Sequence, residues 1–204
     1  MRLARARAWL LPLAFALVPI PTAALVAATT PAPAAPVRSF AIDGARSGAE
    51  FIVRLRLRMR AHGRIAAVSG ELRPDAPGSW RVEVLADGSA LRVAGPRWME
   101  RVTRSEDFLD VERHPEIRFR SAPFSERVLH AGGRVRGQLT LRGLTRPVSF
   151  RLLPSACAQP GRDCDLRVQG IISRTEFGMT AYPRSVKDDV ELRLRVRLLP
   201  ADSP

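Results

Sequence analysis

Lysine is almost absent from this sequence, and other residues that carry chemistry are scarce. Lys187 is the only lysine among the 33 basic residues, and all the others are arginine. Such one-sided use is typical of a composition bias across a genome rather than of a designed patch. The three histidines, His62, His114 and His130, are scattered along the chain. Their spacing does not suit metal ligation, so we predict no metal site.

The motifs that mark common enzyme classes are also missing. The sequence has no Gly-x-Ser-x-Gly, no zinc-type His/Glu set and no phosphate-binding loop. An acidic cluster, Asp107, Asp110 and Glu112, allows acid–base chemistry in principle. A solvated helix end before His114-Pro115 explains this cluster more simply. We therefore predict a protein that is not an enzyme, with no catalytic residue and no cofactor.

The first 28 residues have the layout of a secretory signal. Residues 1–7 are basic and contain no acid, and a mostly apolar run follows over residues 8–28. That run is almost long enough to span a bilayer, so an uncleaved anchor is the alternative. Prolines interrupt the run and small residues end it, which favours cleavage at 22–24 or 26–28. No cysteine lies near residue 25, which excludes a lipoprotein.

The remainder reads as one domain with short flanking segments. The Pro/Ala-rich segment 29–37 predicts a tether. Residues 38–199 are numerous enough to bury a real core in a single domain, and residues 200–204 form a C-terminal tail. The formal net charge of +13 makes the chain basic, which raises the question of an anionic partner.

The two cysteines, Cys157 and Cys164, lie close together in the segment CAQPGRDC. Their spacing is not CxxC, so a metal pair or a redox pair is the weaker interpretation. Pro160 and Gly161 between them favour a turn. Paired cysteines of an exported chain usually close, and we expect a small disulfide at the end of a hairpin.

Apolar and polar residues alternate through nearly the whole domain. In FIVRLRLRMR, residues 51–60, every second residue from Arg54 onward is arginine, which is the period of a strand. Similar strand-like patterns recur at 65–72, 80–85, 90–94, 117–120, 135–141, 148–152, 166–172 and 190–198. The best helical spacing is in residues 97–107. About eight such strands predict an antiparallel barrel or sandwich.

The arginine rows at 54–60 and 193–197 define a basic outer face. Side chains alternate across a strand, so we expect this face to be wet while the apolar row faces the core. A single-strand nucleic-acid binder would place aromatic residues among the bases. Phe51, Phe119 and Phe150 lie on the apolar rows instead, so we predict no nucleic-acid partner. Contact with an anionic membrane surface is a further hypothesis.

Four segments carry a resemblance to a known family. They are IDGARSGAEFIV (42–53), SEDFLDVERHPEIRFRS (105–121), GQLTLRGLTRPVSF (137–150) and ISRTEFGMTAYPRSVKDDVEL (172–192). In this order and spacing they resemble the YceI-like family of polyisoprenoid-binding periplasmic proteins, over about residues 40–198. The resemblance implies an all-β fold, a lipocalin-like antiparallel barrel of about eight strands with one short helical segment. It also implies an apolar cavity for an isoprenoid chain, a periplasmic location and no catalysis.

The sequence departs from the family pattern at three places. Arg46 stands before Ser47 where the family commonly has histidine, and Leu109 stands where a second aromatic residue often follows Phe108. The insert between the two cysteines is not a general family feature. These departures affect the identity of the ligand rather than the fold.

The resemblance makes the inward rows candidates for the cavity lining. The candidate side chains are Phe51, Val53, Leu55, Leu57, Val82, Val84, Trp98, Met99, Phe108, Phe119, Leu139, Leu141, Val148, Phe150, Phe177 and Met179. A filled core would place the same side chains inside, so both interpretations stay open. Those in and just after the helical segment either gate the cavity or plug it.

Arg174 is the one charged candidate. It either contacts the head group of a ligand, such as a quinone carbonyl, or is a buried structural arginine. In the structural case the expected acidic partners are Asp107, Asp110 or Asp189.

Two functions of different classes follow from these observations. The first is a periplasmic protein that holds an isoprenoid lipid, quinone-like or polyprenyl, for carriage or storage. The second is a ligand-free barrel that acts as an interaction module through its basic outer face. The family resemblance also allows a dimer.

Overall fold

The computed structural model describes residues 39–199. The predicted signal, the whole tether and the C-terminal tail therefore lie outside the described residues. The strands are β1 (Phe40–Ala41), β2 (Gly48–Leu55), β3 (Arg60–Ile65), β4 (Val68–Ala76), β5 (Ser79–Asp87), β6 (Leu91–Val93), β7 (Glu116–Ser121), β8 (Phe124–Ser125), β9 (Gly133–Leu141), β10 (Leu144–Leu152), β11 (Leu166–Ser173) and β12 (Val186–Val196).

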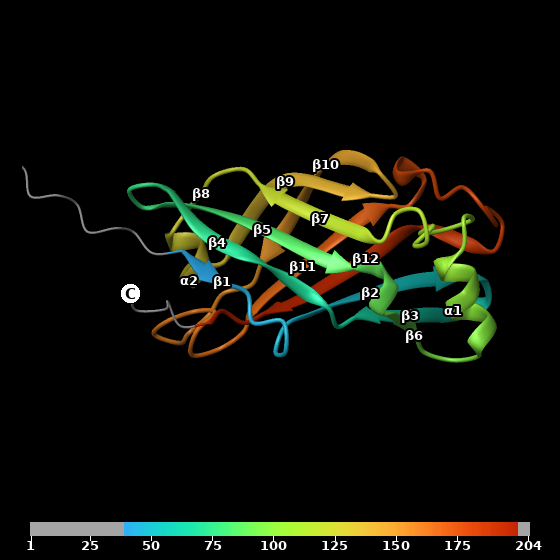
Figure 1. The fold of residues 1–204 in the computed structure, drawn as a ribbon, viewed down its shortest axis with the longest axis horizontal. Helices are drawn as coiled ribbons and strands as arrows, with labels where there is room; N and C mark the ends of the chain where they lie inside the picture. Colours follow the sequence, from blue (N-terminus) through green and yellow to red (C-terminus); the bar gives the residue numbers. More distant parts are fainter. Residues whose placement is uncertain (1–38, 200–204) are drawn as a thin grey trace, which may run out of the picture. The chain divides into compact units, whose positions relative to one another are not determined.

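Helical segments in this part of the chain are short. They are α1 (Arg97–Arg104), α2 (Arg127–Ala131) and the 3₁₀ turns η1 (Arg56–Arg58), η2 (Gly88–Ala90) and η3 (Thr175–Phe177). Helix α1 begins after Pro96 and packs against β6, whereas α2 lies at the opposite end of the molecule (Figure 1). Across residues 39–199, no helix has the length and apolar character that a bilayer crossing requires.

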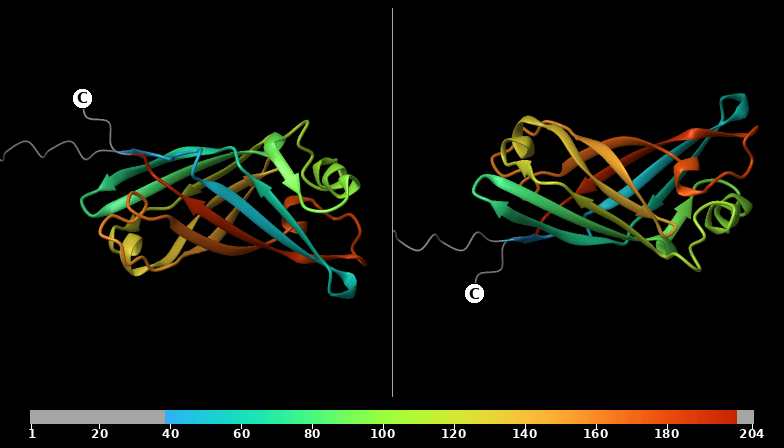
Figure 2. Two further views of the ribbon diagram at one scale, coloured as in Figure 1. Left: turned by 90° about the horizontal axis from the view of Figure 1, so that it is seen from below. Right: turned by 90° about the horizontal axis from the view of Figure 1, so that it is seen from above.

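The strands form one curled antiparallel sheet. Its order is β1-β4-β5-β7-β9-β10-β11-β12-β2-β3-β6, with β8 paired to β5. The chain just after β1 links two sides of this sheet: Ile42 N–H donates to the Gly70 carbonyl at 2.8 Å, and Asp43 N–H donates to the Arg197 carbonyl at 2.8 Å. These bonds join β4 to the segment that follows β12. The sheet thereby wraps around its apolar face as a barrel (Figures 1 and 2).

The prediction of an all-β antiparallel fold is confirmed, whereas the predicted number of strands is wrong. Within residues 39–199 the sheet has 12 strands rather than about eight. The very short strands β1 and β8 carry too few residues to show an alternating pattern, whereas β6 falls within the strand predicted at 90–94. Residues 51–60, predicted as one strand, contain the end of β2, the turn η1 and the first residue of β3. The single predicted helix is confirmed as α1, but α2 was not predicted because five residues are too few to show a helical period.

The core lies inside the barrel and is built from the inward rows of neighbouring strands. Phe119 on β7 lies opposite Leu139 on β9, and Phe150 on β10 lies opposite Val135 on β9. These side chains are all at least nine-tenths buried. The alternation in the sequence therefore selects which side of each strand meets the others.

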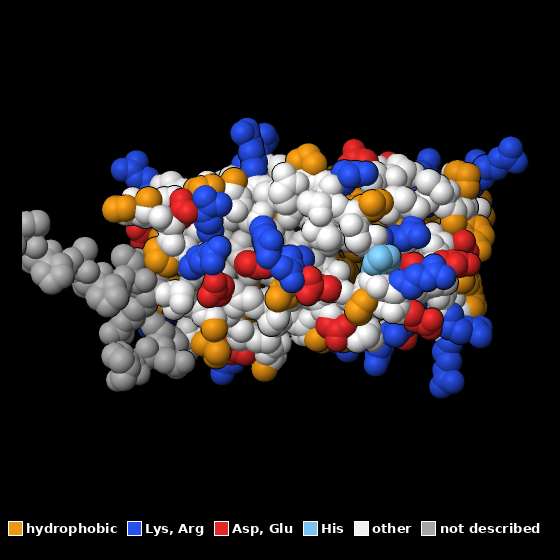
Figure 3. Space-filling view, turned by 45° about the horizontal axis from the view of Figure 1, so that its top comes forward, with side chains coloured by type: hydrophobic (Ala, Val, Ile, Leu, Met, Phe, Trp, Pro, Cys, Tyr) orange, Lys and Arg blue, Asp and Glu red, His pale blue; other side chains and the backbone are white. Residues whose placement is uncertain are grey.

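Charged side chains cover much of the outer wall. On β5 and β7, Glu83 accepts from Arg120 Nε at 2.9 Å, and Glu116 pairs with Arg118 at 2.7 Å. Figure 3 shows basic and acidic side chains interspersed over one face. Exposed pairs of this kind contribute little to stability, so the wall serves mainly to keep the barrel hydrated.

Candidate functional site

An apolar cavity of about 190 Å³ lies inside the barrel. It is many times larger than the space that one water molecule needs. Its lining residues are Ala49, Glu50, Phe51, Val53, Ile65, Leu72, Val82, Val84, Ala86, Thr103, Phe108, Leu109, Ile117, Phe119, Phe124, Leu129, Val135, Leu139, Leu141, Phe150, Leu152, Leu166, Val168, Ile172, Arg174, Met179, Val190, Leu192, Leu194, Val196 and Leu198. Only Glu50, Thr103 and Arg174 among them have polar side chains. Glu50 is exposed and pairs in register with Arg64 and Arg193 of the outer wall.

Phenylalanine rings that pack closely over glycines shape part of the cavity wall. A Cβ added at Gly63 would overlap the ring of Phe51, and one added at Gly170 would overlap the ring of Phe150. Phe119 lies in the same way over Gly137 and meets the Phe150 ring edge-on, with 5.0 Å between the ring centroids. Because a glycine has no side chain, each ring can lie close to the sheet instead of filling the barrel. The space inside depends on these close approaches.

The two ends of the cavity differ in polarity. Thr103, Phe108 and Arg174 line it in the region of α1, whereas Leu129 and Leu198 line it in the region of α2. Figure 1 places these two helices at opposite ends of the barrel. The Thr103 hydroxyl donates to the Met99 carbonyl at 2.8 Å, so its hydrogen-bonding capacity is already used within α1. Arg174 is thus the polar group that distinguishes the α1 end of the cavity.

The Arg174 side chain is 2% exposed and holds the loop that follows it. Its Nε donates to the Lys187 carbonyl at 3.2 Å, and its Nη2 donates to the Val186 carbonyl at 3.3 Å. Nη1 donates to the carbonyls of Met179 and, at 2.8 Å, Ala181. Burial lowers the pKa of the guanidinium, and the nearby charge of Asp188 opposes this shift.

The acidic partners predicted for Arg174 are therefore wrong. Its hydrogen bonds go to backbone carbonyls and none goes to Asp107, Asp110 or Asp189 within the described chain. A guanidinium has five N–H donors, and these four bonds use four of them. The ring of Phe108 lies 5.8 Å from the guanidinium carbon. The second N–H of Nη2 is the donor that these four bonds do not use.

Asp188 fixes the turn that presents Arg174. Its carboxylate accepts from Ser173 Oγ at 2.6 Å and from the Thr175 N–H at 3.1 Å. Burial disfavours the charged form, but the hydrogen bonds from Ser173 and Thr175 and the charge of Arg174 outweigh it and lower the pKa of Asp188. The carboxylate thus holds both neighbours of Arg174 in place.

Ten of the predicted lining side chains lie on the cavity wall. They are Phe51, Val53, Val82, Val84, Phe108, Phe119, Leu139, Leu141, Phe150 and Met179. Arg174 lies there as well. Whether these residues contact a ligand is addressed below as a proposal.

The prediction that Leu57 faces inward is wrong. Strand β2 ends at Leu55, and Leu57 lies in the turn η1 with a side chain that is 89% exposed. The alternating pattern continues through the turn, so the sequence does not show where the strand stops. Trp98, on the outer side of α1, is likewise corrected to a surface position at 55% exposure.

The other predicted residues lie off the cavity wall for different reasons. Phe177 is completely buried in the core beneath η3. Met99 and Val148 are partly buried and pack against the core from outside the cavity. Leu55 is half-buried at the last position of β2.

Sequence reasoning did not single out much of the wall at the α2 end. Leu129 on α2 and Phe124 on β8 belong to elements too short to show a periodic pattern. Val190, Leu192, Leu194 and Val196 on β12, by contrast, alternate clearly in the sequence and could have been identified from that signal.

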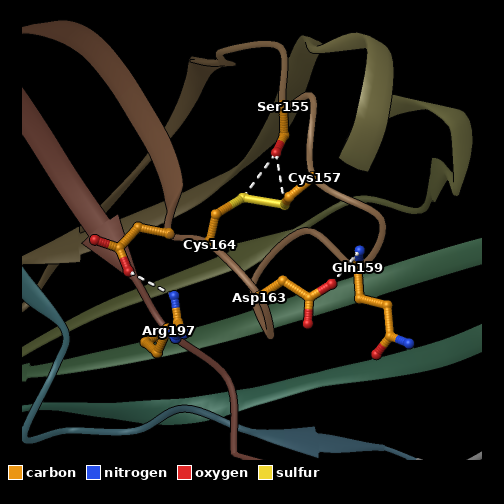
Figure 4. Close-up of a disulfide and its surroundings, with 7 residues drawn as sticks. Ser155, Cys157, Gln159, Asp163, Cys164 and Arg197 are labelled. Atoms are coloured by element: carbon orange, nitrogen blue, oxygen red, sulfur yellow. Dashed lines mark hydrogen bonds and ion pairs between the residues drawn. A yellow bond between two sulfur atoms is a disulfide. The ribbon is translucent and has the colours of Figure 1, made fainter.

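The disulfide Cys157–Cys164 lies at the end of the barrel near α2, as predicted (Figure 4). The Ser155 hydroxyl lies 3.1 Å and 2.9 Å from the two sulfur atoms. Within the loop, Gly161 accepts a hydrogen bond from Leu198 N–H at 2.7 Å. Because Leu198 lines the cavity, the disulfide loop supports this end of the wall.

Two members of the acidic cluster, Asp107 and Asp110, make local contacts. Asp110 and Glu106 both pair with Arg113, at 3.5 Å and 3.8 Å. Asp107 accepts from the Tyr182 hydroxyl at 3.4 Å. Within residues 39–199, no group of three or more His, Cys, Asp or Glu side chains is arranged to hold a metal ion.

Comparison with known proteins supports the fold and the family together. The YceI-like domain model matches residues 40–198. Similar solved structures include BcnA from Burkholderia cenocepacia, with 16% identity and a TM-score of 0.63 over 76% of this chain and 98% of that chain. A polyisoprenoid binding domain from Saccharophagus degradans has 11% identity and a TM-score of 0.57 over 78% of this chain and 97% of that chain.

A third similar structure is a YceI protein from Campylobacter jejuni. It has 16% identity and a TM-score of 0.50 over 68% of this chain and 84% of that chain. At such identities, these likenesses establish the fold. A search of curated proteins gave no match.

Proposed function

The chain belongs to the YceI-like family, and on this premise we propose that it is a lipid-binding protein that holds an isoprenoid chain inside its barrel. The observation that carries the proposal is the cavity of about 190 Å³ with an almost entirely apolar lining. A space of this size with so apolar a lining favours a hydrocarbon ligand. The similar domain from Saccharophagus degradans is itself described as polyisoprenoid-binding, which supports the same ligand class.

Buried area supplies the affinity in such a cavity. Each buried CH₂ group contributes about 0.8 kcal/mol, so an isoprenoid chain gains affinity along its length without specific polar contacts. The Phe150 and Phe119 rings occupy the space over their glycines, which keeps that part of each ring out of the middle of the barrel. We infer that the inward side chains form a binding wall rather than a filled core.

The polarity of the cavity suggests the direction in which the lipid lies. Arg174 lines the cavity near α1 and has one N–H beyond the four bonds to backbone carbonyls. A carbonyl or phosphate oxygen of a head group is a suitable acceptor for this N–H. The isoprenoid tail then extends toward Leu129 and Leu198 at the α2 end.

Carriage or storage in the periplasm is the setting that we propose for this activity. The support is the signal-like pattern of residues 1–28, which lie outside the described residues. A disulfide suits an oxidising compartment. No catalytic step is needed for this role.

Solvent extraction of the purified protein followed by mass spectrometry tests the proposal. We expect a prenyl lipid in the organic phase at close to one molecule per chain. The variant Leu141→Trp, which enlarges a side chain on the cavity wall, should lose that lipid. Ile171→Trp is the matched control because Ile171 is 62% exposed on the outside of β11. A lipid-free extract, even after incubation with quinones and polyprenyl phosphates, would refute the proposal.

A registered row of basic residues favours a second candidate function, an interaction module. Adjacent strands place the following residues side by side across the outer wall: Arg134, Arg151, Gln169, Arg193, Glu50, Arg64 and Arg92. Five of these seven side chains are arginines, so the row is a strongly positive stripe. If the protein is such a module, it carries no lipid, and Leu141→Trp does not affect binding to its partner. Charge reversal at Arg64 and Arg193 abolishes the interaction.

A further inference from the structure

The hairpin tip between β2 and β3 carries large apolar side chains into solvent. Leu57 is 89% exposed and Met59 is 57% exposed, although such side chains usually contribute to a core. Figure 2 shows this hairpin reaching beyond the barrel at the end that holds α1. Trp98 on α1 is also 55% exposed. An apolar tip in a projecting position indicates an apolar partner outside the chain.

The backbone of the tip gives no folding reason for a leucine there. Leu57 and Arg58 have φ values of 59° and 62°, and the Met59 N–H closes the turn onto the Arg56 carbonyl at 3.4 Å. Turns with two positive φ values favour Asn and Gly, because a Cβ is crowded in this conformation. The β9–β10 hairpin follows that rule with Gly143 at φ 70°. The tip therefore presents two bulky side chains at a cost to the turn.

Arginines alternate with the apolar residues of the tip. Arg56, Arg58 and Arg60 lie in a stretch that contains no acidic residue between Glu50 and Glu71. In the described part of the chain, none of these three arginines forms an ion pair with a carboxylate. The Arg60 charge acts on Glu191, whereas the charges of Arg56 and Arg58 are free to meet an anionic surface.

The loop next to the tip has the same character. The Arg56 N–H donates to the Ser185 carbonyl at 2.9 Å, which ties the tip to the loop between η3 and β12. In that loop Tyr182 is 50% exposed. Arg184 and Lys187 add two further positive charges, and no acid lies between Glu176 and Asp188. The two segments together make a basic surface with apolar points.

We propose that this tip docks on a lipid bilayer with anionic head groups. Leu57 and Met59 enter the apolar boundary of the bilayer, while the arginine stems lie along it and the guanidinium groups bind lipid phosphates. Charge complementarity favours an anionic bilayer as the partner, because each basic side chain near an anionic leaflet contributes separately to the binding free energy. A projecting point also suits a bilayer better than a flat protein surface.

The link between docking and lipid exchange rests on the proposed function. The tip lies at the α1 end of the barrel, where Arg174 lines the cavity. Docking there brings the polar end of the cavity to the membrane from which an isoprenoid lipid enters or to which it returns. Docking itself does not depend on the ligand.

Flotation with vesicles that contain no isoprenoid tests the docking step. We expect the purified protein to float with vesicles that contain phosphatidylglycerol. Its affinity for phosphatidylcholine vesicles should be lower, by roughly fivefold for each arginine in contact with the membrane. Raising the salt concentration should weaken binding to the anionic vesicles. The double variant Leu57→Asn with Arg58→Gly should bind roughly tenfold more weakly or worse, while its melting temperature stays the same or rises.

Ile171→Ser is the matched control. It removes an apolar side chain that is 62% exposed on the barrel wall, away from the tip, and should float like the wild type. Equal flotation of the wild type and the tip variant would overturn the proposal, as would the absence of wild-type flotation on anionic vesicles. Analytical sedimentation of the same samples shows whether the protein is a dimer. If the wild type is a dimer and the tip variant is a monomer, the tip serves self-association and the proposal is wrong. Extraction of bound prenyl lipid is measured separately, so failure of docking and failure of the proposed function are distinguishable.

Discussion

The ring of Phe150 lies directly over Gly170 on the neighbouring strand, where a Cβ would overlap its atoms. This contact keeps an aromatic ring against the sheet and out of the space inside the barrel. The same relationship joins Phe51 to Gly63. These glycines leave room for large side chains to pack close against the sheet.

The variant Gly170→Ala should push the Phe150 ring into the cavity. We expect a loss of about 1–3 kcal/mol in the free energy of unfolding, which is typical of overpacking, together with reduced retention of prenyl lipid. Urea denaturation and solvent extraction measure the two effects. Gly48→Ala is the control, because a Cβ there would meet only the Ile65 carbonyl oxygen at 3.6 Å, an ordinary contact. Equal effects of the two substitutions would contradict this account of the cavity.

Replacement of Arg174 by methionine should strongly destabilise the protein. Four backbone carbonyl groups lose their donor in the interior, and each buried group left unpaired costs about 1–3 kcal/mol. We expect a loss of about 3 kcal/mol or more in urea denaturation, with Arg174→Lys intermediate. Arg146→Met removes an exposed arginine that bonds the Glu176 carbonyl at 3.1 Å and should change stability by less than about 0.5 kcal/mol. A mild effect of Arg174→Met would show that its bonds to the loop are dispensable.

Asp188 should make part of the stability pH-dependent. Its pKa in the folded protein is lowered, against burial, by hydrogen bonds from Ser173 and Thr175 and by the charge of Arg174. Its stabilising effect is therefore present above the unfolded-state pKa of about 3.9 and is lost as the pH falls through the folded-state value. Asp188→Asn should be less stable than the wild type near neutral pH, and the difference should shrink on acidification.

Denaturation curves from about pH 7 down to about pH 2 measure that convergence. Asp189→Asn removes the neighbouring carboxylate, which accepts no side-chain hydrogen bond within the described residues. A similar convergence for Asp189→Asn would assign the effect to net charge rather than to the turn around Arg174.

Reduction of the disulfide should loosen the α2 end of the barrel. The cysteines are separated by seven positions, and opening so short a loop costs about 2 kcal/mol through the entropy of the unfolded chain. The double variant Cys157→Ser with Cys164→Ser should show this loss by thermal or urea denaturation, with or without a reductant. Ser155→Ala keeps the disulfide and serves as the control. If reductant leaves the wild-type midpoint unchanged, the loop is held by its other contacts alone.

The sequence by itself determined which side chains face inward along most strands. Val53, Val84 and Leu139 could be assigned from alternation alone, because the two-residue period of a strand is a local property of the backbone. The disulfide and the helix over 97–104 were also readable, since close cysteines and helical spacing are local signals. The family resemblance was confirmed over residues 40–198.

Only the tertiary structure decided where that alternation stops and what lies within the barrel. Leu57 continues the apolar row in sequence, but the chain reverses at η1 and turns this side chain out to solvent. The carbonyl partners of Arg174 come from the loop after η3 and from the start of β12, whose relative positions depend on tertiary packing. Whether inward side chains fill a barrel or leave a cavity depends on sheet curvature and on contacts between strands, such as Phe150 over Gly170. These are relationships between distant parts of the chain, and no local pattern specifies them.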